Sequence, residues 1–364
     1  MTDKHAFDAI SLAEVVAKLF RAAGLCESAS RLVAGTLVDA DLAGQHSHGV
    51  MLVDMYLDRL RHGSVSARGE AEIISDRDGS VVLDARNALG QMVGDQAIGI
   101  AIDRSRRYGT GVVAVRHGFH FGVARRYAVA AADAGCVGIA MCNTRPLMPA
   151  PGGAERVVGN NPIAIAIPTA GEVPLVLDMA TSEAAMGKIR MAAKSGQAIP
   201  PTWAVKADGS STTSPEEAIA GLLLPAAGPK GFGLSFMIDM LCGLLSGGAH
   251  GEAVQPLYGD PAIPYDCSLL FIAIDVPHFR ALKDFKDEAE AAARRIRAGR
   301  KAPGIEQLHT PGSIEWARRR DAGGSVRLEP TVLDMLRRVA AELGVDASIL
   351  QNHAPEATKE TTRA

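Results

Sequence analysis

The segment from residue 111 to residue 143 most constrains the fold, because two wholly apolar runs flank one amphipathic stretch. GVVAV (111–115) and VGIAMCN (137–143) are predicted strands, and residues 123–134 are a predicted helix that ends at Gly135. Continuous apolar runs are typical of strands that are covered on both faces. The pattern therefore predicts an α/β domain built on a sheet.

The rest of the chain adds strands and helices around this unit. A chain of 364 residues is too long for one ordinary core, so two or three domains are expected. The predicted further strands are 72–75, 80–84, 163–168, 175–179 and 269–275. The predicted further helices are 8–23, 27–62, 91–108, 183–193, 232–245, 279–299 and 331–343, with a loop over 300–328.

Composition excludes several classes of protein. The net charge of −3 and the 4% aromatic content give no footprint for nucleic acid. No apolar run reaches the length of a membrane span, and the N-terminus lacks a signal-peptide core. The five cysteines are scattered and form no CxxC pair, which argues against a disulfide framework and a zinc site and favours a reducing cytoplasm.

The first polar cluster is Gln45-His46-Ser47-His48-Gly49, which interrupts an apolar pattern of helical spacing. A hydroxyl beside an imidazole suggests proton transfer, because histidine changes charge near neutral pH. A buried histidine at a helix bend explains the same residues equally well. This segment alone leaves both interpretations open.

The second polar cluster, residues 116–122, follows the strand 111–115 and precedes the helix that is predicted from Val123. Ligands of open α/β sheets bind where strands lead into helices, so His117 or His120 could exchange protons or bind phosphate there. A turn with exposed histidines is the alternative. Metal binding by the histidine pairs is disfavoured, because no nearby cysteine or carboxylate completes a ligand set.

Three weaker clusters also follow predicted strands or begin predicted helices. Asn160 and Asn161 either hold a turn or bind a ligand amide. Asp178 ends a strand and could accept bonds from ribose hydroxyls, whereas Thr181 or Ser182 is expected to cap the next helix. Lys230 opens a helix whose Leu234, Met237, Ile238, Leu241 and Leu244 are expected in the core. No G-x-G-x-x-G sequence is present, so a nicotinamide cofactor would need another cradle.

Jointly, these clusters resemble the type 2 malate/L-lactate dehydrogenase family. The similar stretches lie in the family's order between residues 7 and 345: DLAGQHSHGVMLVDMYLDRLRHG, FHFG, GNNPIAIAIP, LVLDMATSEAAMGK, IPPTWAVKADGSSTTSP and GPKGFGLSFMIDMLCGLLSGG. The resemblance implies a mixed α/β (α+β) non-Rossmann fold. Its expected parts are a helical domain over 1–75, joined by helices in 300–364, and an α/β region over 76–299 that binds cofactor and substrate.

The resemblance also implies an NAD(P)-dependent oxidoreductase, cytoplasmic and homodimeric, that interconverts a 2-hydroxy acid and a 2-oxo acid. A cyclic-imine reductase and a nucleotide-binding homologue without turnover are the alternatives. By position, Ser47, His48 and His120 match catalytic residues, and the two imidazoles are expected to converge beside the nicotinamide ring. The implied cofactor contacts are His120, Thr144, Asn161, Asp178, Met179, Ala180, Lys230, Gly231, Pro311 and Gly312.

The chain departs from the family pattern at three positions. Leu52 stands where many members place the arginine that binds the substrate carboxylate, and leucine cannot form that bidentate pair. Asn160 occupies the position of a threonine in the family pattern. Lys188 occupies a position, next to Gly187, where one member has an acidic residue. The candidates to replace the missing arginine are Arg59, Arg61, Arg116, Arg125 and Arg145.

Overall fold

The computed structural model describes residues 5–351. Contacts between Cα atoms divide these residues into two compact units, one formed by 5–63 and 315–351 and the other by 64–314. The sequence-based domain boundaries at 75/76 and 299/300 stay a prediction beside this division. Each unit is described here by itself.

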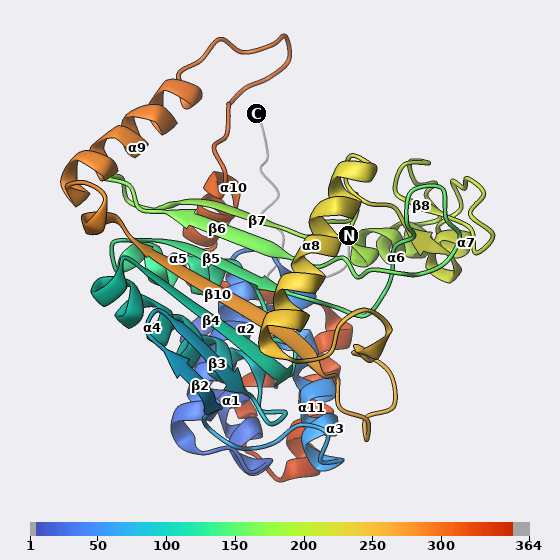
Figure 1. The fold of residues 1–364 in the computed structure, drawn as a ribbon. Coiled ribbons are helices and arrows are strands. Elements are labelled where there is room, and N and C mark those ends of the chain that lie inside the picture. The colour runs from blue at the N-terminus through green and yellow to red at the C-terminus, as the bar shows by residue number, and fades with distance from the viewer. Residues whose placement is uncertain (1–4, 352–364) are drawn as a thin grey trace, which may run out of the picture. The chain divides into compact units, whose positions relative to one another are not determined.

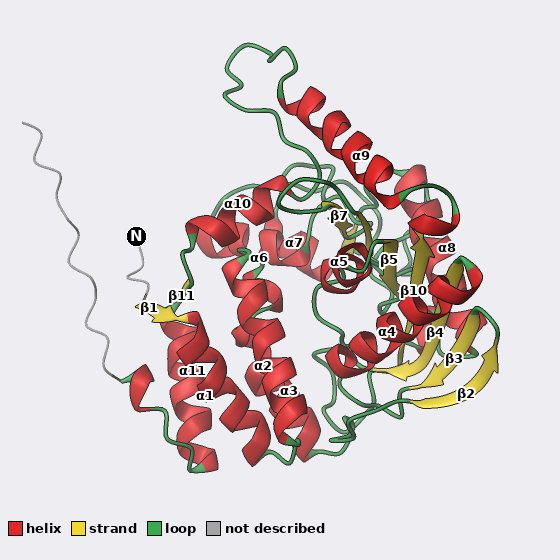
Figure 2. Cartoon of the chain, turned by 90° about the vertical axis from the view of Figure 1, so that its left-hand side faces the viewer, coloured by secondary structure: helices red, strands yellow, loops and turns green. Residues whose placement is uncertain are grey.

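The first unit is helical and joins both ends of the described chain. Its elements are β1 (His5–Asp8), α1 (Ala9–Ala22), α2 (Glu27–Leu42), α3 (Val53–Arg61), most of α10 (Ser313–Asp321), β11 (Ser325–Leu328) and α11 (Pro330–Leu343). Asp8 caps α1 by accepting a bond from the Ser11 N–H at 2.9 Å. Strands β1 and β11 pair antiparallel, and Figure 2 shows them as two short arrows beside α1 and α11.

Two predictions about this unit are wrong. Residues 27–62 do not form one helix, because α2 ends at Leu42 and two 3₁₀ turns, His46–His48 and Val50–Leu52, precede α3. Residues 300–328 are not only loop, since they contain α10 and β11. Helix α10 has no buried side chain, and β11 pairs with a strand more than 300 residues away in sequence, so neither gives a local signal.

The second unit is built on a seven-stranded sheet with the order β2-β3-β4-β10-β5-β6-β7 (Figure 1). Only β3 and β4 are parallel neighbours. Strand β10 lies between β4 and β5 and is antiparallel to both. The strands are β2 (Glu72–Arg77), β3 (Ser80–Asp84), β4 (Thr110–Gly118), β5 (Cys136–Cys142), β6 (Ile163–Ile167), β7 (Leu175–Met179) and β10 (Cys267–Asp275).

Helices α4 (Gly90–Tyr108) and α5 (Arg125–Asp133) cover one face of this sheet at short range. A Cβ atom on Gly111 would lie 2.0 Å from the Ala101 carbonyl oxygen, and one on Gly138 would lie 2.3 Å from that of Ala128. Only glycine fits these two positions, which explains why small residues interrupt the apolar strands. The Phe121 and Tyr127 rings stack on each other, and the Phe271 ring meets Tyr127 edge-on at a centroid distance of 5.2 Å.

Helix α8 (Pro229–Ser246) packs on the other face, against β10, β4 and β5 (Figure 1). Its inward side consists largely of small or polar residues, and of the five residues expected in the core only Ile238 is buried. Leu234, Met237, Leu241 and Leu244 are 37–60% exposed, so their placement in the core is wrong. The large apolar side chains of α8 point away from the sheet.

A lobe made of residues 181–228 precedes α8. It contains α6 (Met186–Ser195), β8 (Ala204–Val205), α7 (Pro215–Ala220) and β9 (Leu222–Leu223), and Figure 1 draws them together near the start of α8. Its small core joins Ile189, Ala204 and Leu223 of the lobe to Met148 and Val158, which precede the lobe in sequence. Helix α9 (Leu282–Arg297) completes the unit and buries only Ala293.

All five cysteines are free thiols. Cys142, Cys242 and Cys267 are buried close to one another, and burial raises the pKa of each well above its usual value. Cys136 is also buried, whereas Cys26 in the helical unit is exposed. Among residues 5–351, no helix combines the length and the apolar content that a membrane span requires.

Candidate functional site

The turn that carries Ser47 and His48 is held by one buried carboxylate. Asp41 Oδ2 accepts the Val50 N–H at 2.8 Å, and Asp41 Oδ1 lies 2.9 Å from His46 Nδ1. A Cβ atom on Gly49 would lie 2.2 Å from Asp41 Oδ1. His46 is therefore part of the support of the turn, and Gly49 makes room for the carboxylate.

Ser47 and His48 are coupled directly within this turn. The Ser47 hydroxyl lies 2.9 Å from His48 Nδ1, so it fixes the orientation of the imidazole. Burial lowers the pKa of His48 from its usual value, which keeps the ring neutral at pH 7. A neutral imidazole that is already oriented can accept a proton.

The second polar cluster begins inside a strand, because β4 extends to Gly118 rather than ending at residue 115. Asp84 on β3 binds two members of the cluster, Arg116 through Nε at 3.1 Å and His117 through Nδ1 at 3.0 Å. Burial acts to raise the pKa of Asp84, but hydrogen bonds from His117, Arg86 and Arg116 outweigh it and lower the pKa. His117 therefore supports the structure.

His120 lies in the loop between β4 and α5, and this loop packs on the start of α4. A Cβ atom on Gly90 would lie 2.2 Å from the Phe119 carbonyl oxygen and 2.7 Å from the His120 carbonyl carbon. His120 is partly exposed and belongs to the second unit, whereas Ser47 and His48 belong to the first. The expected convergence of His48 and His120 stays a prediction.

Several residues that the resemblance assigns to the cofactor are linked by hydrogen bonds. Asn161 is fully buried; its Oδ1 accepts the Thr144 N–H at 2.8 Å, and its Nδ2 donates to the Ser235 carbonyl on α8 at 2.9 Å. The Ser235 hydroxyl donates to the Gly159 carbonyl at 2.7 Å. Asn161 thus fixes Thr144. No local pattern predicts the part played by Ser235, because both of its contacts are with residues distant in sequence.

The end of β7 lies against the segment that leads into α8. The Thr181 N–H donates to the Asn160 carbonyl at 3.2 Å, and the Thr181 carbonyl accepts the Ala226 N–H at 2.9 Å. These bonds tie residues 178–181 to the segment just before Lys230, which is exposed on the first turn of α8. The expectation that Thr181 or Ser182 caps α6 is wrong, because Ala185 occupies that cap position.

The residues gathered here fit a nicotinamide dinucleotide. The Thr181 hydroxyl is buried and has no hydrogen-bond partner within residues 5–351, so a polar ligand group would satisfy it. Lys230 brings a cation to the start of an 18-residue helix, where an anion is favoured. Gly231 is required by the fold itself, since a Cβ atom there would lie 2.2 Å from the Ala226 carbonyl oxygen.

Pro311 and Gly312 lie beside strand β7. The Pro311 carbonyl accepts the Val176 N–H at 3.2 Å, and Gly312 adopts a φ of +84°, where glycine is favoured. Met179 and Ala180, which follow Asp178, are partly exposed. Strand β7 therefore brings the late turn and the Asp178 segment to one edge of the sheet.

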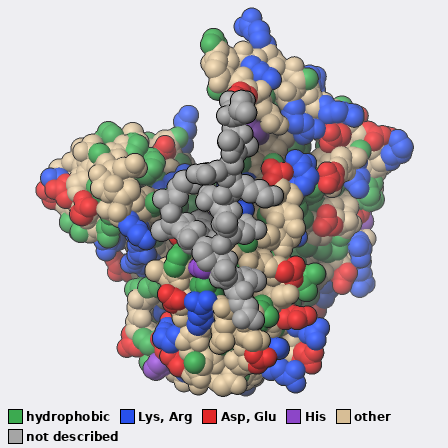
Figure 3. Space-filling model, turned by 180° about the vertical axis from the view of Figure 1, so that it is seen from behind, with side chains coloured by type: hydrophobic (Ala, Val, Ile, Leu, Met, Phe, Trp, Pro, Cys, Tyr) green, Lys and Arg blue, Asp and Glu red, His purple; other side chains and the backbone are tan. Residues whose placement is uncertain are grey.

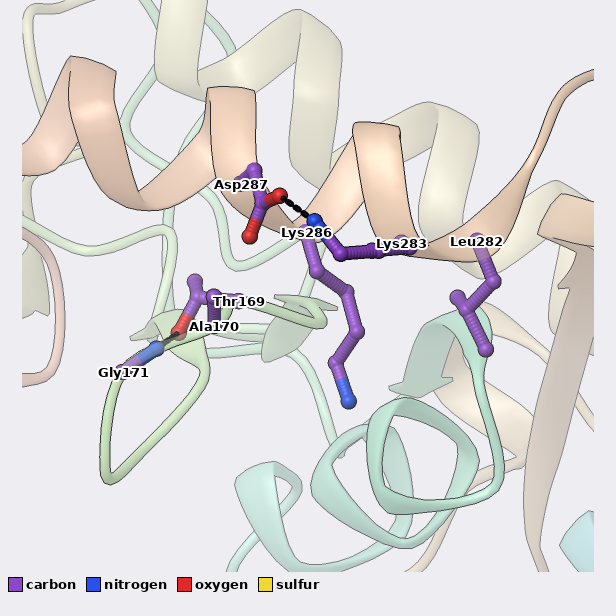
Figure 4. A pocket seen from close by; sticks show the side chains of 7 residues that line it. All are labelled: Thr169, Ala170, Gly171, Leu282, Lys283, Lys286 and Asp287. Carbon is purple, nitrogen blue, oxygen red and sulfur yellow. Dashed lines mark hydrogen bonds and ion pairs between the residues drawn. The ribbon is translucent and has the colours of Figure 1, made fainter.

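A separate depression of about 430 Å³ lies between the loop after β6 and the start of α9 (Figure 4). None of its lining residues is a predicted site residue; they are Thr169, Ala170, Gly171, Leu282, Lys283, Lys286 and Asp287. Asp287 binds Lys283 at 2.7 Å.

In the described part of the chain, no three potential metal ligands gather in one place. Where grey does not cover it, the face in Figure 3 mixes basic and acidic side chains.

Comparison with known proteins places these features in context. The family model described as malate/L-lactate dehydrogenase matches residues 7–337. A malate dehydrogenase of Pyrococcus abyssi is 36% identical over 341 residues, which cover 91% of this chain and 92% of that protein. A ureidoglycolate dehydrogenase (NAD(+)) of Escherichia coli K12 is 37% identical over 300 residues, which cover 82% and 85%.

Solved structures agree with these sequence relatives. The sulfolactate dehydrogenase of Methanocaldococcus jannaschii superposes with a TM-score of 0.90 at 32% identity, covering 96% of this chain and 99% of that one. A delta1-piperideine-2-carboxylate reductase from Pseudomonas syringae pvar. tomato gives a TM-score of 0.82 at 27% identity, covering 92% and 99%. The predicted mixed α/β fold without a Rossmann fingerprint is confirmed by these neighbours.

Proposed function

Because the chain belongs to the malate/L-lactate dehydrogenase family, we propose that it transfers a hydride between NAD(P) and C2 of a 2-hydroxy acid/2-oxo acid pair. The observation that carries this proposal is the Ser47–His48 pair, an oriented imidazole whose pKa is lowered. The network that fixes Thr144 and leads to Lys230 supports it.

The second unit would hold the cofactor. Thr144 and the Asp178–Ala180 segment offer hydrogen-bonding groups, and Lys230 offers a positive charge for phosphate. The buried Thr181 hydroxyl lacks a partner in the described part of the chain. Bound NAD(P) supplies or accepts the hydride. Whether the chain takes NAD or NADP is decided by measuring activity with each.

His48 exchanges the substrate proton in this proposal. When a hydroxy acid is oxidised, the neutral imidazole accepts the proton of the C2 hydroxyl; when an oxo acid is reduced, the imidazolium returns it to the carbonyl oxygen. Ser47 holds the ring through Nδ1 and so orients it for this transfer. His120 is the alternative proton-transfer residue.

The first test is a spectrophotometric screen of NAD(P)H oxidation against a panel of 2-oxo acids and cyclic imines. With the best substrate, His48→Asn or His120→Asn is expected to lower kcat by about 10²- to 10⁴-fold, the usual contribution of a general acid. His62→Asn is the matched control, because His62 is exposed at the end of α3. If both site variants keep the wild-type kcat, the proton-transfer proposal is wrong.

A cyclic-imine reductase is the second candidate function. The structural match to a delta1-piperideine-2-carboxylate reductase favours it, and the same histidine would then protonate the imine nitrogen. Turnover of a cyclic imine with no turnover of any 2-oxo acid would select this candidate. Cofactor binding with no turnover of either class would instead indicate a nucleotide-binding homologue.

We further propose that two copies of the chain form a homodimer. From β4 to β7, one register row on the α8 side of the sheet is apolar, and on β3 it continues to Ser80. Its apolar members are partly or largely exposed: Val112, Ile272, Ile139, Ile165 and Leu177. Val112, Ile139 and Ile272 pack against the cluster that contains the inward-facing Ile238, so they lie beside α8 on the same face of the sheet. An uncharged, pleated surface of this kind fits a second copy of itself about a two-fold axis.

The free thiols support a reducing compartment, and we propose the cytoplasm.

A further inference from the structure

A 2-oxo acid needs a cation for its carboxylate, and the chain has leucine at the position where an arginine is expected. Leu52 is 2% exposed, so it offers no polar group to a ligand. A guanidinium that binds a carboxylate through two bonds must be accessible and must not already be paired with an acid. The arginines that could meet these two requirements are Arg59, Arg61, Arg116, Arg125 and Arg145.

Four of the five arginines fail one of the requirements. Arg59 and Arg125 are buried, at 1% and 6% exposure. Arg61 pairs with Glu342 at 3.5 Å, and Arg116 donates to Asp84 at 3.1 Å. The fifth, Arg145, is partly exposed and has no acidic partner among the described residues.

Arg145 is also the arginine that lies nearest in sequence to the proposed cofactor residues. It follows Thr144 directly, and Asn161 holds the Thr144 N–H at 2.8 Å. The backbone at this point is therefore fixed by a fully buried side chain. A guanidinium that is carried on such a rigid segment is well placed for directional binding.

Two further arginines come to the same neighbourhood through the fold of the lobe. The Leu147 N–H donates to the Val158 carbonyl at 2.9 Å, and Met148, Val158 and Ile189 share one hydrophobic cluster. Arg156, two residues before Val158, and Arg190, directly after Ile189, flank this cluster, and both are near enough for their charges to act on Arg145. Burial, and then the positive charges of Arg156 and Arg190, lower the pKa of Arg145.

The three guanidinium groups are not equivalent. Arg156 donates to the carbonyl oxygens of Ala220 at 3.2 Å and Gly221 at 2.8 Å, so its position is set by the backbone. Arg190 is exposed and, like Arg145, has no acidic partner among the described residues. Three like charges that repel one another, with no carboxylate among them, are stabilised when an anion binds.

We propose that Arg145, assisted by Arg190, binds the carboxylate of the substrate and so replaces the arginine that Leu52 displaces. This inference rests on the proposed 2-oxo acid reductase function. It assigns substrate recognition to the strand end that also carries Thr144. Hydrogen bonds to a charged group contribute about 1.5–3 kcal/mol each, so the loss of one changes binding by roughly 10- to 150-fold.

The test compares Arg145→Gln, which removes the charge, with Arg145→Lys, which keeps it without the planar fork. We expect Arg145→Gln to raise KM for the best 2-oxo acid by about 10- to 150-fold, and Arg145→Lys to raise it less. The Kd of NAD(P)H, measured by fluorescence, should change less than about twofold. Arg295→Gln, on an exposed position of α9, is the matched control.

The outcomes separate this inference from the proposed function. If the wild type reduces 2-oxo acids and Arg145→Gln keeps its KM, or if its Kd for NAD(P)H rises instead, Arg145 does not bind the carboxylate. If the wild type reduces no 2-oxo acid, the proposed function fails, and oxalate then replaces the substrate as a probe. Oxalate should raise the Tm of the wild type and of Arg295→Gln but not that of Arg145→Gln; an equal rise in all three contradicts the inference.

Discussion

At the scale of single residues, position 49 requires glycine because the Asp41 side chain faces it closely, and not because of its backbone conformation. Its φ of −91° suits any residue, but a Cβ atom would enter the Asp41 carboxylate. We expect Gly49→Ala to lower the free energy of unfolding by about 2–4 kcal/mol, because the carboxylate loses its bonds to Val50 and His46. Urea unfolding measures this. Gly35→Ala, with open space around its Cβ position in α2, should raise stability by about 0.5–1 kcal/mol; equal effects would contradict the account.

The lowered pKa of His48 predicts how the activity depends on pH. Burial lowers its pKa below the usual value of about 6.5, so the base is neutral at higher pH and protonated only below that value. The kcat/KM for oxidation of a hydroxy acid should therefore rise with pH up to a midpoint below about 6.5 and then stay level. Reduction should show the opposite slope through the same midpoint. A midpoint above pH 7, or an unchanged profile in His48→Gln, would show that another group titrates.

At the scale of elements, Asn143 at the end of β5 fastens α8 to the sheet. Its Nδ2 donates to Asp239 Oδ1 at 2.9 Å and to the Ala249 carbonyl at 2.8 Å, while its Oδ1 accepts the Ser268 N–H at 2.7 Å. Asn143→Ala leaves the buried Asp239 carboxylate short of a donor, so unfolding should cost about 2–4 kcal/mol less. Chemical denaturation checks this. Asn160→Ala, which removes only a bond from the Thr144 hydroxyl, should cost about 1 kcal/mol or less.

Elements with a strong local pattern could be predicted from the sequence, and elements shaped by distant contacts could not. Strands β3 and β7 have the predicted bounds, 80–84 and 175–179, because each is a short apolar run between turn residues. The apolar spacing predicts a helix through the QHSHG segment, but the bonds of Asp41 hold the chain in 3₁₀ turns there. Among the site residues, the pairing of Ser47 with His48 is local, whereas the bond from Asn161 to Ser235 joins residues 74 positions apart.

At the scale of the whole molecule, the outward apolar side of α8 is expected to be covered by a second chain. The double change Met237→Lys and Leu244→Lys, at positions 55% and 60% exposed, should convert a dimer to a monomer in sedimentation velocity at micromolar concentration. Ile10→Lys, at a 73% exposed apolar position in the helical unit, should leave the mass unchanged. A wild type that sediments as a monomer would remove the homodimer proposal.

This surface shows why the arrangement of the second unit was beyond sequence reasoning. An apolar residue in α8 gives the same sequence pattern whether it faces a core or another chain, so the pattern predicts Leu241 in the core. The position of β10 between β4 and β5 likewise depends on pairings such as Ile272 with Val112 and with Ile139, more than 130 residues away. Periodicity reports which side of an element is apolar, but it does not report what covers that side.

The distribution of thiols allows opening of the second unit to be measured by alkylation. The thiolate is the reactive form of cysteine, and burial suppresses it at Cys136, Cys142, Cys242 and Cys267. Cys26 is exposed, and hydrogen bonds lower its pKa, so an alkylating reagent modifies it first. A brief pulse of iodoacetamide followed by mass spectrometry would therefore show intact molecules with one adduct and opened molecules with up to five, and would count the two populations without any added dye.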